Sequence, residues 1–161
     1  MSARYEINRN ENGTSYHFIT SSGNTYIAYF TEFTMLNRNR KDVPILSFGF
    51  SCKLTDDDEP QRYDRKIKST IIYIIEEFFN ALPTESILYF CMNQDGKAKN
   101  RHLIFDKWFK EFSHGLEKHN TPEASAKHDF YGSILLKSAN PNKQKFIDAF
   151  YFTIDYWDLG C

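Results

Sequence analysis

The stretch that decides the fold is DRKIKSTIIYIIEEFFNALPTESILYFCM, residues 64–92. Asp64 is a typical helix N-cap, and the apolar residues after it recur at spacings of three and four, which predicts a helix over 65–82. Its apolar face consists of Ile67, Ile71, Ile74, Ile75, Phe78, Phe79 and Leu82. Pro83 ends this helix, and the unbroken apolar run ILYFCM (87–92) is typical of a strand that is buried on both faces and pairs in parallel.

Upstream of this helix, the sequence predicts a three-stranded antiparallel meander. SYHFIT (15–20) and TYIAYFTEFT (25–34) flank the turn-forming cluster SSGN, and PILSFGFSCKL (44–54) is dense in β-forming residues. The apolar positions of the second strand alternate only in part: Tyr26, Ala28, Phe30 and Phe33. YEI (5–7) is a candidate for an additional first strand, and the acidic segment 55–63 connects the meander to the helix.

Downstream, the turn NQDG leads into a second helix, expected over 99–115. Its inward positions are expected to be Ile104, Phe105, Trp108, Phe109 and Phe112. A looser segment (116–127) precedes a strand (128–138), and a third helix follows Pro141. Its apolar positions are Phe146, Ile147, Phe150 and Ile154.

These elements define the expected fold class as α+β, with the order β-β-β-α-β-α-β-α. We expect one domain over residues 1–161, with a mixed sheet of about five strands, an N-terminal antiparallel meander and three helices. The ribonuclease-H-like fold and the central part of the GNAT acetyltransferase fold share this order, which does not choose between them.

Composition narrows the classes of function. A formal charge of -1 lacks the global attraction of a dedicated nucleic-acid binder, so a nucleic acid is not an expected partner. No segment approaches the ~18 consecutive apolar residues of a membrane helix, so we expect a cytoplasmic protein with no membrane partner. Cys52, Cys91 and Cys161 form no CxxC pair, and neither a disulfide framework nor a metal site is predicted.

The starts of the first two helices carry basic residues where acidic ones are normally favoured. If the strand before the first helix and the strand after it are parallel, both helix N-termini lie at the carboxyl ends of neighbouring strands, an edge where open α/β sheets bind ligands. We therefore predict an anion-binding edge that accepts a phosphate. Its candidate residues are Arg65, Lys66, Lys68, Asn93, Asp95, Lys99 and Arg101. The simpler interpretation is a set of solvated charges, balanced by the acidic connector.

Several of these positions form a wider pattern. It combines D-x-x-I-x-x-T from Asp64 to Thr70, a strand ending in C-x-x-x-D at Asp95, and R-x-x-x-F-x-x-W-F from Arg101. Together with the strand pair marked by Tyr16, Phe18, Gly23 and Tyr26, it resembles an uncharacterised family of small bacterial proteins classed as a domain of unknown function. That resemblance implies no activity.

The same region is similar, more distantly, to the cofactor-binding core of GNAT acetyltransferases. There a glycine-rich loop cradles the coenzyme A pyrophosphate, and an asparagine follows the next strand, a place that Asn93 could take. This chain has no glycine between Gly49 and Gly96, which argues against a working acetyltransferase. A ribonuclease-H-like nuclease requires a carboxylate within its first strand, and YHFIT has none.

The leading hypothesis is therefore that the protein is a binding or interaction module and not an enzyme. Catalytic residues are unknown, and no cofactor is predicted. Its expected partner is an unknown protein or a phosphate-bearing small molecule. The aromatic edge strands also make a homodimer one expectation. A GNAT-like acyltransferase and a metal-dependent nuclease are the alternatives.

Overall fold

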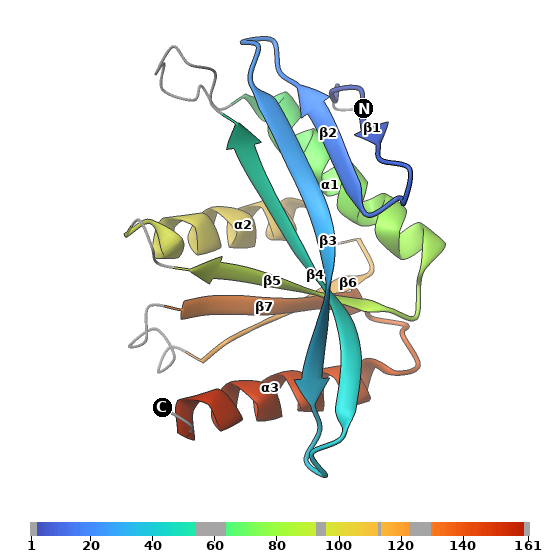
Figure 1. Ribbon diagram of the computed structural model, residues 1–161, viewed down its shortest axis with the longest axis vertical. Coiled ribbons are helices and arrows are strands. Elements are labelled where there is room, and N and C mark those ends of the chain that lie inside the picture. Colours follow the sequence, from blue (N-terminus) through green and yellow to red (C-terminus); the bar gives the residue numbers. More distant parts are fainter. Residues whose placement is uncertain (1–2, 54–63, 93–95, 113, 123–129, 160–161) are drawn as a thin grey trace.

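A seven-stranded mixed sheet, in the order β1-β2-β3-β4-β5-β7-β6, organises the protein (Figure 1). The computed structural model describes residues 3–53, 64–92, 96–112, 114–122 and 130–159. The strands are β1 (Asn8–Arg9), β2 (Ser15–Ile19), β3 (Thr25–Leu36), β4 (Asp42–Lys53), β5 (Ser86–Met92), β6 (Leu116–Asn120) and β7 (Phe130–Lys137). The helices are α1 (Arg65–Ala81), α2 (Ala98–Phe112) and α3 (Lys143–Leu159). The predicted α+β class is confirmed.

One pair of strands in this sheet is parallel. β1 to β4 form an antiparallel meander, and β7 pairs antiparallel with both β5 and β6. β4 and β5 run in parallel, with α1 as the crossover between them, and they pair only from Leu46–Phe48 to Ile87–Tyr89. Beyond that short contact β4 turns steeply away from β5 (Figure 1), as the twist of a sheet allows. The carboxyl ends of the two parallel strands therefore diverge.

Each face of the sheet carries its own hydrophobic core. α1 and α2 cover one face, where Ile71, Ile74 and Phe79 of α1 pack against Phe18 and other residues of the meander. α3 covers the other face, and its buried residues pack against Leu88, Ile134 and further strand residues. β5 contributes to both cores, because Ile87 and Tyr89 point to the first and Leu88 to the second. This confirms the prediction of a strand that is buried on both faces.

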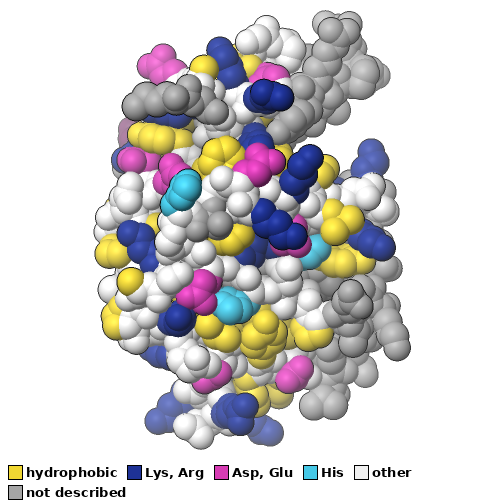
Figure 2. All heavy atoms as spheres, turned by 180° about the vertical axis from the view of Figure 1, so that it is seen from behind, with side chains coloured by type: hydrophobic (Ala, Val, Ile, Leu, Met, Phe, Trp, Pro, Cys, Tyr) yellow, Lys and Arg dark blue, Asp and Glu magenta, His cyan; other side chains and the backbone are white. Residues whose placement is uncertain are grey.

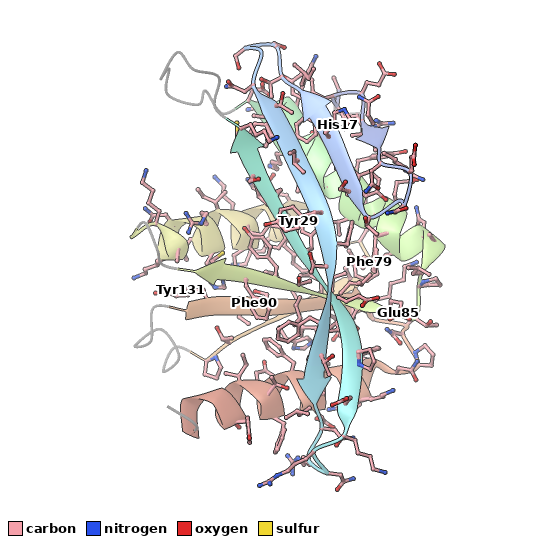
Figure 3. The ribbon with its side chains drawn as sticks, viewed as in Figure 1. His17, Tyr29, Phe79, Glu85, Phe90 and Tyr131 are labelled. Atoms are coloured by element: carbon pink, nitrogen blue, oxygen red, sulfur yellow. The ribbon has the colours of Figure 1, made fainter. Side chains whose placement is uncertain are left out.

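The long hairpin of β3 and β4 also serves both cores, one with each half. Near the turn to β2, Tyr26, Ala28 and Phe30 point towards α1. At the other end, Met35 packs with the α3 core, and Phe33 meets Phe90 of β5 edge-on at 5.6 Å (Phe90 is labelled in Figure 3). The partial alternation of this strand therefore arises because its two halves bury opposite faces.

The structure corrects four details of the sequence-based expectation. The sheet has seven strands rather than about five. The additional strand β6 lies within the segment that was expected to be loose, and the first strand is residues 8–9 rather than 5–7. Tyr5 instead docks on α1, where its backbone N–H donates to Thr70 Oγ1 at 2.9 Å. Leu82 and Ile104 are about half exposed rather than inward, because Leu82 is the C-cap of α1 and Ile104 faces a cavity. In the described part of the chain, no helix is long and apolar enough to cross a membrane.

Candidate functional site

The N-terminus of α1 is capped by a carboxylate of the chain itself. Asp64 accepts a hydrogen bond from the Ile67 backbone N–H at 3.0 Å, and its other oxygen accepts one from the Tyr5 hydroxyl at 2.6 Å. The first turn of α1 contains no acidic residue. Asp64 thus places a negative charge at the positive end of the helix, which offsets the unfavourable placement of Arg65 and Lys66 beside it.

A cavity of about 610 Å³ lies between α1 and α2. We call it the cationic cavity, because three basic side chains and one acidic side chain contribute to its wall. It is lined by Arg65, Lys68, Ser69, Ile104, Lys107, Trp108, Glu111 and Phe112. Figure 2 views the molecule from the side of these two helices and shows lysine and arginine side chains among apolar ones. The cavity is thus both charged and partly apolar.

The cations of this cavity share one carboxylate. The Lys68 ammonium forms an ion pair with Glu111 and lies 5.1 Å from the centre of the Phe112 ring. The hydrogen bond from Lys68 is the main reason why the pKa of Glu111 lies below its usual value, and the charges of Lys107 and Arg65 act in the same direction. Glu111 therefore stays ionised at neutral pH and partly neutralises the basic side chains of the cavity.

A second cavity, of about 530 Å³, opens where β4 and β5 diverge. We call it the aromatic cavity, because half of its lining residues are aromatic. It is lined by Tyr26, Phe50, Ser51, Cys52, Ile67, Tyr89, Arg101, Ile104, Phe105 and Trp108. Ile104 and Trp108 belong to both cavities. The two cavities are therefore neighbours separated by one turn of α2.

The polar groups of the aromatic cavity are held in defined protonation states. Burial and the neighbouring Cys52 raise the pKa of Tyr26 to about 12. Burial, together with Cys91, also raises the pKa of Tyr89, against the opposing charge of Arg101. Both phenols are therefore neutral hydrogen-bond donors at physiological pH. Arg101 supplies the one formal charge on the described wall of this cavity.

The structure brings together only part of the predicted anion-binding edge. Arg65 and Lys68 line the cationic cavity, and Arg101 lines the aromatic cavity. Lys66 lies over the Tyr5 ring, with its nitrogen 5.3 Å from the ring centre, and Lys99 is exposed and outside both described linings. The remaining two candidates, Asn93 and Asp95, lie outside the described residues. Whether any of these residues binds a ligand stays a prediction.

A buried polar network connects α2 to the strands β6 and β7. The Lys118 side chain, only 3% exposed, forms an ion pair with Asp106 of α2 and a hydrogen bond to Asn120. Asn120 also donates to Asp106 at 3.2 Å and accepts from the Ser133 hydroxyl at 2.8 Å. Burial lowers the pKa of Lys118, although Asp106 opposes this effect. The network connects α2, β6 and β7, and so fixes the helix that forms a wall of both cavities.

Sequence reasoning missed two lysines of this region and one of the two roles of Trp108. Lys107 follows the same basic run as Arg101, but a helical wheel alone does not place it opposite α1. Trp108 was expected in the core; it is indeed buried, yet it also lines both cavities. Lys118 gave no signal, because an isolated lysine in a polar segment reads as solvated. Among the described residues, no group of three or more histidine, cysteine, aspartate and glutamate side chains could hold a metal ion.

The fold and its cavities define an α+β protein with a mixed sheet and two adjoining cavities, one at the diverging ends of its parallel strands. Residues 63–151, more than half of the chain, match the family model described as "Family of unknown function (DUF6169)", and the chain belongs to this family. A search of curated proteins and a search of solved structures each found no significant match.

Proposed function

We propose that this protein binds a phosphate-bearing small molecule in the cationic cavity. The observation that carries the proposal is the convergence of Arg65, Lys68 and Lys107 on one cavity in which Glu111 is the only acidic lining residue described. Guanidinium and ammonium groups form charge-assisted hydrogen bonds with phosphate oxygens, about twice as strong as those between neutral groups. The site therefore suits an anion with several acceptor oxygens.

The burial of Lys68 supports a binding role over a set of independent surface charges. Its side chain is 16% exposed, whereas that of its partner Glu111 is 44% exposed. A cation held between two helices has less competing water than a free surface lysine, so a second anion interacts with it more strongly. The two helices also hold the three cations on separate rigid elements, which reduces the ordering that binding requires.

A GNAT-like acyltransferase is the second candidate, and one observation favours it. β4 and β5 are the parallel pair, α1 is the crossover between them, and a cavity opens at their carboxyl ends. The central part of the GNAT fold has the same order of elements. The lack of glycine between Gly49 and Gly96 counts against it, because bulky residues hinder close approach of a pyrophosphate to the backbone. No observation favours the nuclease alternative.

The proposal extends to the setting of the protein. A cytoplasmic location agrees with the absence of any apolar run of membrane-spanning length in the sequence, and phosphorylated metabolites are abundant in that compartment. A protein partner or a second copy of the chain remains part of the hypothesis, as an addition to the small-molecule site. Neither is required for the cationic cavity, whose described wall comes from α1 and α2.

Thermal unfolding with added ligands tests the proposal. Pyrophosphate, ribose 5-phosphate and acetyl-CoA should be compared with sodium sulfate at equal ionic strength. A ligand at about 100 times its dissociation constant stabilises the native state by ~2.7 kcal/mol. For a chain of this length that corresponds to a rise in melting temperature of roughly 5–10 °C.

Matched variants assign any such rise to the cationic cavity. Arg65→Ala combined with Lys107→Ala should abolish it, because two of the three cations are lost. Lys110→Ala, an exposed change on the same helix outside both described linings, should leave it intact. If both variants lose the rise equally, overall charge explains the effect and the site proposal fails. If no phosphate compound shifts the wild-type melting temperature, the basic residues are solvated surface charges.

A further inference from the structure

We propose that the aromatic cavity holds a planar heteroaromatic ring attached to the phosphate group, so that the ligand is a nucleotide or a nucleotide-containing cofactor. This inference rests on the proposed function for the phosphate end of the ligand. It adds a second binding site and a chemical class to that proposal, and it uses the aromatic cavity, which the binding of a phosphate alone leaves without a role.

The first support is the alignment of the rings around the cavity. The Phe50 ring lies 6.2 Å from the Trp108 ring and 6.1 Å from the Tyr89 ring, centre to centre, with interplanar angles of 18° and 15°. Three rings on different elements are thus stacked with nearly parallel planes, and all three line the cavity. Parallel aromatic faces are the surfaces on which nucleic-acid bases stack, and they accept any base because each base has a π-face.

The second support is the presence of polar side chains in the lining of the aromatic cavity. Tyr26 and Tyr89, which carry hydroxyls, and Arg101, which carries a guanidinium, line the aromatic cavity. A purely apolar ligand makes no use of these polar side chains. A base offers acceptor nitrogens and carbonyl oxygens at its edge to these donors. The cavity is therefore suited to a heteroaromatic ring rather than to a hydrocarbon chain.

The third support is the connection between the two cavities. Ile104 and Trp108 line both, and they are four residues apart on α2, a rise of about 6 Å along the helix. A linker the size of a sugar spans this distance along α2. With a ring on one side, the linked phosphate lies among Arg65, Lys68 and Lys107 on the other. The charge of the cationic cavity thus selects a phosphorylated ligand over a free base.

Calorimetric titration of the full chain tests the inference with four probes: AMP, adenosine, ribose 5-phosphate and acetyl-CoA. Stacking of one base is worth ~1–3 kcal/mol, so AMP should bind roughly 5- to 150-fold more tightly than ribose 5-phosphate. Adenosine, which lacks the phosphate, should also bind more weakly than AMP. If acetyl-CoA binds more tightly than AMP, the ring belongs to a nucleotide-containing cofactor and not to a simple nucleotide.

Tryptophan fluorescence tests directly whether a ligand ring binds beside Trp108. The chain has two tryptophans, so Trp157→Phe leaves Trp108 as the single emitter. Binding of AMP or acetyl-CoA should quench Trp108 emission, and ribose 5-phosphate should not. Phe50→Leu keeps an apolar side chain but removes the central ring, and it should weaken AMP binding without changing that of ribose 5-phosphate. Leu103→Ala, an exposed change beside Ile104 outside both described linings, is the matched control.

The outcomes separate this inference from the proposed function. Equal affinities for AMP and ribose 5-phosphate, with no quenching by either nucleotide probe, overturn the ring site but leave the phosphate site. Failure of all four probes to bind overturns both. Thermal unfolding of Phe50→Leu in the absence of ligand verifies that the variant is folded. If Phe50→Leu does not fold, the comparison of AMP with ribose 5-phosphate on the wild type still tests the ring site.

Discussion

Removal of Asp106 should leave a buried positive charge beneath α2. The Lys118 side chain is 3% exposed, and its ammonium contacts only Asp106 and Asn120 among the hydrogen bonds described above. In Asp106→Ala, Lys118 loses its counter-ion and Asn120 loses an acceptor for its amide N–H.

The size of the effect follows from the burial of the two partners. Removal of one member of a fully buried ion pair costs about 3–5 kcal/mol. The Asp106 side chain is 26% exposed and Asn120 keeps one bond to Lys118, so we expect a loss just below this range, about 2–3 kcal/mol. This corresponds to a fall in melting temperature of roughly 4–12 °C. The additional change Lys118→Met should restore most of the loss, because it removes the unpaired charge.

Urea unfolding of the wild type and the two variants measures these differences. A loss below about 1 kcal/mol for Asp106→Ala, as is typical of exposed ion pairs, contradicts the burial of Lys118. So does a double variant that is no more stable than Asp106→Ala alone. Equal slopes of the unfolding free energy against urea in all three proteins are needed for the comparison.

The dependence on pH gives a second readout with a defined sign. Burial raises the pKa of Asp106, but its hydrogen bond and charge interaction with Lys118 outweigh this and hold the pKa below its ordinary value of 3.8. The wild type should therefore lose stability as the pH falls below about 3.8, a loss that Asp106→Ala lacks. The pKa of Lys118 is also lowered, so stability should rise as the pH increases towards the ordinary value of 10.5. The deficit of the variant should shrink over the same range.

Three further predictions follow from single contacts. Asp64→Ala removes the cap of α1 and should lower stability by about 1 kcal/mol, whereas Asp64→Asn should retain most of it; equal urea midpoints contradict the capping role. Thr153→Val removes a hydroxyl that accepts from the Leu36 backbone N–H at 2.9 Å, which should cost about 1 kcal/mol and speed hydrogen exchange at Leu36; an unchanged exchange rate rules out the contact. Glu111→Gln should tighten pyrophosphate binding, because the carboxylate competes for Lys68; unchanged affinity in titration rejects this competition.

The parallel crossover could be predicted because its signals are local. The helical spacing from Ile67 to Phe79 and the unbroken apolar run at 87–92 each report their own environment, and the structure confirms both as α1 and β5. The strand count could not be predicted in the same way. β6 reads LEKHN, and an edge strand with charged side chains lacks the alternation that marks a strand. Its stability depends on the buried contacts of Lys118, which the sequence does not display.

The candidate site was predictable to the level of helix ends and no further. The position of Arg65 and Lys68 at the start of α1 follows from the Asp64 cap, but the cavity that they line lies between α1 and α2 and not at the carboxyl ends of β4 and β5. Helical periodicity assigns Ile104 and Trp108 to an apolar face, but it does not distinguish a face that meets the core from one that borders a cavity. That distinction arises from the divergence of β4 and β5, a consequence of twist.

The division of the β3–β4 hairpin between two cores has a consequence for synthesis of the chain. Met35, Val43 and Ile45 belong to the core that α3 covers, and α3 begins 90 residues after β4 ends (143 − 53). At about 5–20 residues per second, a ribosome needs roughly 5–18 s to make that interval. During this time the half-hairpin has an uncovered apolar surface, a condition in which nascent chains aggregate or recruit chaperones. Slowing translation between residues 53 and 143 should therefore reduce the yield of folded protein more than slowing it before residue 25.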